Sequence, residues 1–103
     1  MEAAVFKALG DPIRLRMMKR LSSGSSFNIT SISYELGITR QGARKHLQVL
    51  IDAQVVRMEP QGREMIVQLN PDVLEKAKKY IDMLGKQWEQ RLGALKDFVE
   101  GGK

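Results

Sequence analysis

Residues 40–53 constrain the fold of this chain more than any other segment, because their side chains divide between two faces of a helix. One face is apolar and recurs at helical spacing, and it consists of Ala43, Leu47, Leu50 and Ile51, with Gln54 just beyond. The opposite face holds only basic and amide side chains, namely Arg40, Gln41, Arg44, Lys45 and Gln48. The sequence therefore predicts a helix that packs on a core with one face and leaves a basic face in solvent.

This basic face is a local patch and not part of a uniform excess of charge. The chain has 17 Lys and Arg against 12 Asp and Glu, a net charge of +5. No acidic residue lies between Glu35 and Asp52, although that interval contains three basic residues. A concentrated positive patch favours a polyanionic partner, of which nucleic acid is one.

Two short helices are predicted at the start of the chain. The first covers residues 3–9 and ends at Gly10. The second begins with Asp11 as its N-cap and Pro12 in its first turn, and its Arg and Lys side chains are expected in solvent. Its buried stripe is expected to comprise Ile13, Leu15, Met17, Met18 and Leu21.

A third short helix and a tight turn come directly before the basic helix. Asn28, or else Thr30, is the expected N-cap of the third helix, and Gly37 ends it. Thr39 is placed to cap the helix over 40–53. Two helices joined by a three-residue turn are typical of a helix-turn-helix unit.

A β-hairpin is predicted after the basic helix. Its strands cover residues 55–59 and 63–69, within a wing over 55–69, and its turn is Pro60-Gln61-Gly62. Alternation in the second strand predicts that Met65, Val67 and Leu69 share one face, and that Glu64, Ile66 and Gln68 share the other.

The last predicted helix is unusually long for so small a domain. Asn70-Pro71 marks its start, the pattern carries it over residues 71–99, and residues 100–103 form a tail. Its apolar seam contains Leu74, Ile81, Trp88 and Leu95 at seven-residue spacing. An apolar seam that is so long at the end of so small a domain indicates a partner helix.

These elements in the order ααααββα predict one mainly α domain over residues 1–99 with a small β-hairpin, the winged helix-turn-helix architecture. A helix fits the DNA major groove, where Arg bonds guanine and Gln bonds adenine. The expected base contacts are Arg40, Gln41 and Arg44. The whole set of candidate DNA-binding residues is Thr30, Ser31, Thr39, Arg40, Gln41, Arg44, Lys45, His46, Gln48, Gln61 and Arg63. For His46, a packed side chain is as good an interpretation as a DNA contact.

Several motifs, in order along residues 3–99, resemble those of the ArsR/SmtB family of bacterial winged-helix repressors. They are residues 6–16 (FKALGDPIRLR), 36–41 (LGITRQ), 45–50 (KHLQVL) and 62–64 (GRE). The resemblance implies a homodimer formed through the first and last helices, and a fourth helix that reads an imperfect palindrome in double-stranded DNA. Together with the apolar seam, it implies an interface of Val5, Phe6, Leu9, Leu74, Ala77, Ile81, Leu84, Trp88, Leu92 and Leu95.

The sequence departs from the metal-sensing members of that family. Where some members carry two cysteines, this chain has Asn28 and Thr30, and the last helix lacks the histidines that others use. We therefore expect no metal and no cofactor, and a repressor that does not respond to metal and whose effector is unassigned. One alternative is a repressor with a non-standard metal or small-molecule site. Another is a winged-helix module that binds protein, although such a module would carry apolar or acidic residues on the helix over 40–53.

Other classes of function find little support. The chain has no cysteine, one histidine and no Gly-x-x-x-x-Gly-Lys loop, so neither a nucleophile with its base nor a nucleotide site is evident, and we expect no enzymatic activity. No apolar run approaches the roughly 20 residues that cross a bilayer, and no signal peptide is recognisable. We expect a cytoplasmic protein without membrane attachment.

Overall fold

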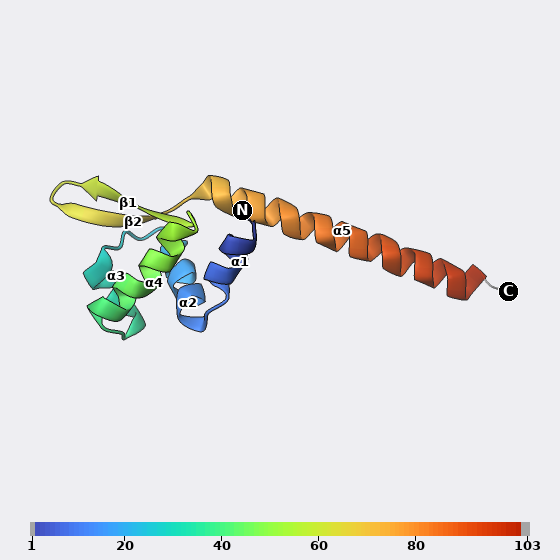
Figure 1. Ribbon diagram of the computed structural model, residues 1–103, viewed down its shortest axis with the longest axis horizontal. Helices are drawn as coiled ribbons and strands as arrows, with labels where there is room; N and C mark the ends of the chain where they lie inside the picture. The colour runs from blue at the N-terminus through green and yellow to red at the C-terminus, as the bar shows by residue number, and fades with distance from the viewer. Residues whose placement is uncertain (1, 102–103) are drawn as a thin grey trace.

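The computed structural model describes residues 2–101 as five helices and one antiparallel hairpin in the order ααααββα (Figure 1). The elements are α1 (Glu2–Leu9), α2 (Pro12–Leu21), α3 (Ile29–Leu36), α4 (Arg40–Asp52), β1 (Val56–Gln61), β2 (Glu64–Leu69) and α5 (Pro71–Gly101). The predicted winged helix-turn-helix architecture is confirmed. None of the described helices is long and apolar enough to span a membrane.

The core lies where α1 to α4 meet the hairpin. Its largest fully buried side chains come from four elements and one connecting segment, and they are Met17, Ile32, Leu47, Leu50, Val55 and Val56. A third short segment extends the sheet, because the backbone N–H of Val67 donates to the carbonyl of Phe27 at 2.8 Å. The hairpin is thus fixed to the residues that lead into α3.

Polar caps set the starts of three helices as the sequence predicts. The carboxylate of Asp11 accepts the N–H groups of Ile13 and Arg14 at the start of α2. Asn28 and Ser31 form a reciprocal capping box at the start of α3. Thr39 accepts the N–H of Gly42 at 3.0 Å at the start of α4.

Helix α5 leaves the core after two turns and projects away as one rod (Figure 1). Val73 and Leu74 pack against the core and Ala77 is buried, whereas residues 78–100 are all exposed. The molecule is accordingly elongated, 70 × 25 × 23 Å. The helix runs two residues past the predicted end at 99.

Helix α2 differs from the sequence prediction at two positions. Met17 and Leu21 are buried, and Ile13 and Met18 are half-buried against the core. Leu15 lies on the other side of the helix and is 53% exposed. Arg14, predicted to be in solvent, is half-buried and donates through Nε to the carbonyl of Ala8.

The hairpin also departs from the prediction. Its turn is Gly62-Arg63, with Gly62 at φ 65°, while Pro60 and Gln61 extend β1 and pair with Met65 and Glu64. Ile66 and Val67 are both buried, and Val67 belongs to the core cluster. Burial therefore does not alternate along β2, although its side chains still divide between two faces as predicted, because successive residues of a strand point to opposite sides.

The end of α4 holds a strained residue. The N–H of Val55 donates to the carbonyl of Leu50 and that of Gln54 to Ile51, the pattern of a Schellman cap. Gln54 takes the left-handed position with φ 63°, and it is the only residue other than glycine to do so among residues 2–101. It is exposed, so its predicted place beside the core was wrong.

Replacing Gln54 should test that strain. A left-handed conformation costs a residue with a Cβ atom about 1 kcal/mol, which glycine avoids. Gln54→Gly is expected to raise the free energy of unfolding by up to about 1 kcal/mol, whereas Gln54→Ala, which keeps the Cβ atom, should change it little. Urea denaturation of both variants measures this, and a destabilised Gln54→Gly protein would contradict it.

Candidate nucleic-acid interface

Helix α4 is held in place by its apolar face and by the turn before it. Ala43, Leu47 and Leu50 are buried, as predicted. Gly37 ends α3 at φ 67°, a left-handed conformation that suits glycine, and the chain turns through Ile38 into the cap at Thr39. The orientation of α4 is therefore fixed by packing on one side and by a three-residue turn at its start.

The outer face of α4 presents unpaired cations to solvent. Arg40, Arg44 and Lys45 are exposed, and none of them forms an ion pair with any part of the chain that the structure describes. Gln41 is exposed beside them, whereas Gln48 is engaged with Asp52, to which its Nε2 donates at 2.8 Å. The face can therefore donate hydrogen bonds to an anion without breaking an existing ion pair.

The tip of the hairpin places a further cation in solvent. Arg63 lies in the turn and is exposed, as is Gln61 at the end of β1. Unlike Arg57, which pairs with Glu59 at 2.7 Å on β1, Arg63 has no acidic partner among residues 2–101.

The turn end of the hairpin is joined to the start of α3. Asn28 donates from Nδ2 to the carboxylate of Glu64 at 2.6 Å. A hollow of about 200 Å³ lies there, and it is lined by residues that include Thr30, Arg40 and Glu64. The starts of α3 and α4 and the hairpin thus meet on one surface. Thr30 is exposed on it, but the hydroxyl of Ser31 is committed to the α3 capping box.

His46 faces away from this basic surface. Its Nδ1 lies 3.2 Å from Nη1 of Arg14 and 3.8 Å from Oδ2 of Asp11, and 23% of its side chain is exposed. The packed interpretation of His46 agrees with this position at the junction of α2 and α4. Local sequence patterns do not reveal this cluster, because only the fold brings the start of α2 next to a residue 35 positions later.

Asp11 is the acidic member of the cluster. The hydrogen bond from the backbone N–H of Arg14 lowers the pKa of the Asp11 carboxyl below its usual 3.8, and partial burial opposes this shift. The N–H of Ile13 and the positive charges of Arg14 and His46 also lower it.

Acid should therefore weaken the start of α2. The folded Asp11 carboxyl binds its proton less tightly than the unfolded one, so the stability it contributes is present above 3.8 and is lost as the pH falls through the lower folded pKa. Asp11→Asn keeps a capping oxygen but does not titrate. Between about pH 5 and about pH 2 its urea midpoint should fall less than that of the wild type. Parallel decreases in the two proteins would refute this role.

The predicted interface residues fall into three groups. Val5 and Ala77 are already buried where α1 packs on α5, and Phe6 stacks at an angle on Tyr80 with ring centroids 5.8 Å apart. The others on the far part of α5 are exposed, and they are Ile81, Leu84, Trp88, Leu92 and Leu95. Leu9 and Leu74 are half-buried against the core.

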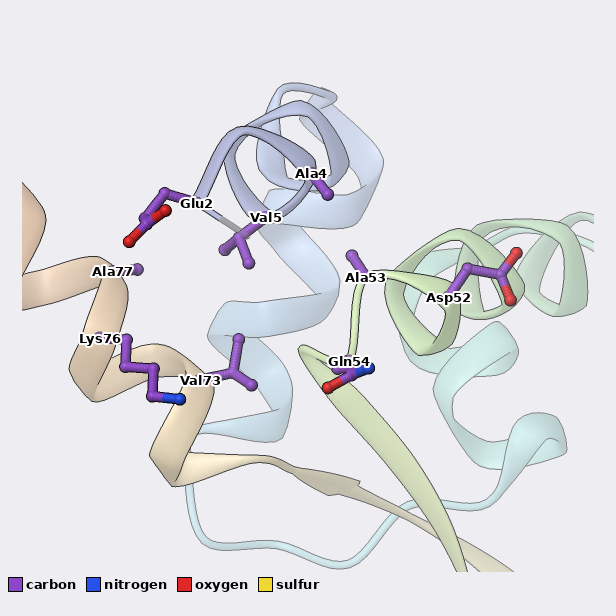
Figure 2. A pocket seen from close by; sticks show the side chains of 9 residues that line it. All are labelled: Glu2, Ala4, Val5, Asp52, Ala53, Gln54, Val73, Lys76 and Ala77. Atoms are coloured by element: carbon purple, nitrogen blue, oxygen red, sulfur yellow. The ribbon is translucent and has the colours of Figure 1, made fainter.

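A cavity of about 430 Å³ lies away from the basic surface, between α1, the end of α4 and the start of α5. Val5 and Val73 point into it, while the side chain of Asp52 points away (Figure 2). Glu2 and Lys76 lie at its edge. Nowhere in residues 2–101 do three His, Cys, Asp or Glu side chains gather closely enough to hold a metal ion.

Comparison with known proteins identifies the same unit. A family model described as a helix-turn-helix domain matches residues 9–59. YuzN of Bacillus subtilis (strain 168), an uncharacterized HTH-type transcriptional regulator, is 35% identical over 78 residues, which span 70% of this chain and 85% of YuzN. The structure of an ArsR-like transcriptional regulator from Rhodococcus sp. RHA1 has a TM-score of 0.81 and 29% identity, covering 94% of this chain and 91% of that one. A homodimeric winged helix-turn-helix domain, Mb0332 from Mycobacterium bovis, has the same fold with a TM-score of 0.64 and 21% identity, covering 82% of this chain and 78% of that one.

Proposed function

This chain belongs to the helix-turn-helix transcriptional regulators of the ArsR family, and from that premise we propose that it is a homodimeric repressor that binds a specific operator without responding to metal. The observation that carries the proposal is the exposed, unpaired basic face of α4, which is presented beside the hairpin. Regulators bind DNA through such a face because it supplies both charge and hydrogen-bond donors.

The roles of the basic residues follow from their positions. Arg40, Gln41 and Arg44 lie on the exposed face of α4, where a helix in the major groove presents its side chains to base edges. Lys45 and Arg63 flank that face and would contact phosphates or the minor groove, as would Thr30 and Thr39 at the starts of α3 and α4.

A two-fold dimer sets the form of the operator. Two copies of α4 would enter successive major grooves roughly 34 Å apart, which requires an imperfect palindrome with half-sites about one helical turn apart. The DNA directly upstream of the gene for this protein is the first operator to test, since such a repressor can control its own synthesis.

Two substitutions separate base reading from backbone contact. Arg44→Ala should cost about 1 to 3 kcal/mol on the specific operator and relax the preference for one base. Arg63→Ala should weaken binding to every sequence alike and lower the salt slope by about 1. Fluorescence anisotropy at two salt concentrations measures both effects, with Arg57→Ala as the matched control because Arg57 is paired with Glu59.

The same titration tests the rest of the proposal. Binding of the wild type should favour the operator over random DNA and should not change when zinc is added. If neither Arg44→Ala nor Arg63→Ala alters operator affinity, the assigned DNA surface is wrong. Release of the operator by zinc would overturn the metal-independent part alone.

The homodimer has its own test. Trp88 is 60% exposed in the single chain, so Trp88→Asp should leave the fold intact and bury two carboxylates in the dimer, which would then dissociate. Sedimentation velocity distinguishes the two states. A variant that still sediments as a dimer would place the interface elsewhere.

A further inference from the structure

The turn of the hairpin is not held in place by burial. Residues 59–65, which include the end of β1, the turn and the start of β2, are all exposed. The hairpin extends from the core on the side opposite α5, with its turn at the far end (Figure 1). A two-stranded hairpin is only marginally stable by itself, so a turn without buried side chains needs another contact to fix its direction.

Two hydrogen bonds attach β2 to the segment that leads into α3. The backbone N–H of Val67 donates to the carbonyl of Phe27 at 2.8 Å, and Val67 is buried. Nearer the turn, Nδ2 of Asn28 donates to Oε1 of Glu64 at 2.6 Å. Three residues of strand span about 10 Å, so this second bond lies well beyond the first and beside the turn. It is the only side-chain hydrogen bond of residues 60–65 in the part of the chain that the structure describes.

The side chain of Asn28 is itself held in a fixed orientation. Its Oδ1 accepts the backbone N–H of Ser31 at 2.8 Å, and its own backbone N–H donates to Oγ of Ser31 at 2.9 Å. The two ends of one planar amide therefore bind different elements, Oδ1 the start of α3 and Nδ2 the start of β2. Helix α3 is anchored in turn by Ile32 and Leu36, which are buried. Glu64 is thus tied to a rigid part of the fold by an amide that cannot rotate without breaking the α3 cap.

We propose that Asn28 and Glu64 are positioning residues for DNA binding, because their hydrogen bond holds the hairpin turn against the start of α3 and so directs Arg63 toward the nucleic acid backbone. This inference rests on the proposed function, in which Arg63 contacts phosphates or the minor groove. Thr30 and Arg40 line the same hollow as the bond, so the turn is held beside other proposed DNA contacts. A cation that is already held in place loses less conformational freedom on binding, so more of its attraction to the anion appears as affinity.

Two variants of Glu64 that have the same charge test this role. Glu64→Gln and Glu64→Met both remove the carboxylate and have side chains of similar length, but only glutamine keeps an oxygen that can accept from Nδ2 of Asn28. A hydrogen bond of this kind changes an equilibrium constant by roughly two- to tenfold. In fluorescence anisotropy, the Glu64→Met protein should therefore bind the operator about two- to tenfold more weakly than the Glu64→Gln protein.

Asn28→Ser provides the matched background. Serine also caps a helix, so α3 should remain folded, but its short hydroxyl does not replace the amide donor toward residue 64. In this background the two Glu64 variants should bind the operator equally, within about twofold. A difference that persists would mean that residue 64 acts on the DNA by itself, and it would overturn the role of Asn28. Because the bond acts through Arg63, Arg63→Ala should cost more affinity in the Glu64→Gln protein than in the Glu64→Met protein.

Backbone amide relaxation in solution NMR measures the hold on the turn without DNA. The order parameter of the Arg63 N–H should be that of rigid backbone, about 0.85, in the wild type and in the Glu64→Gln protein. It should fall toward about 0.6 in the Glu64→Met and Asn28→Ser proteins. The N–H of Val67, which is buried and bonded to Phe27, should not change and is the internal control.

The outcomes separate this inference from the proposed function. An Arg63 order parameter that is equal in all of these proteins would overturn the hold of Asn28 on the turn. A lower order parameter with equal operator affinity of the two Glu64 variants would overturn the positioning role, because the turn would move without consequence for binding. A wild type that binds no DNA would overturn the proposed function and the positioning role together, although the order parameters would still establish whether Asn28 holds the turn.

Discussion

The burial of one face of α4 is the interaction on which the rest of the structure depends. Ala43, Leu47 and Leu50 are almost completely removed from solvent. Burial of these two leucines contributes several kcal/mol to stability. Any rotation of α4 that exposed them would lose this free energy, so the orientation of the helix is fixed. With that face fixed, the side chains half a helical turn away are directed outward, and in this chain they are cations and amides. Core packing thereby also determines which residues are available for DNA.

Local signals account for most of what the sequence predicted correctly. The caps at Asp11, Asn28 and Thr39 and the left-handed Gly37 each depend on a few neighbouring residues, so their sequence patterns are read with little ambiguity. The division of α4 into two faces depends only on helical periodicity. Together these signals gave the order of the elements and the exposed basic residues of the candidate surface.

The failures arose where distant parts of the chain decide the outcome. Leu15 is exposed because the side of α2 that packs on the core is narrower than the apolar stripe predicted from the sequence. Val67 is buried next to Ile66 where β2 pairs with Phe27, 40 residues earlier in the chain, so this burial leaves no alternating pattern within β2. His46 faces Asp11 and Arg14 for the same reason. Periodicity describes one element at a time, whereas these positions depend on which element packs beside it.

The long helix α5 has one part that packs on the core and a longer part that projects into solvent. Its first three turns stabilise the protomer through the core and α1, as the contact of Phe6 with Tyr80 illustrates. The remaining turns contribute nothing to the core of the single chain and expose apolar area that only another molecule can cover. In the proposed homodimer, folding and assembly would use successive lengths of the same helix.

We propose that the outer face of α4 reads base edges in the major groove. Methylation of guanine N7, which lies in that groove, tests it directly when the operator is modified before binding and the bound and free fractions are compared. The account predicts interference at guanines in two segments about one helical turn apart, with loss of interference at one guanine in each half-site for Arg44→Ala. Binding that is indifferent to N7 methylation throughout the operator would contradict it.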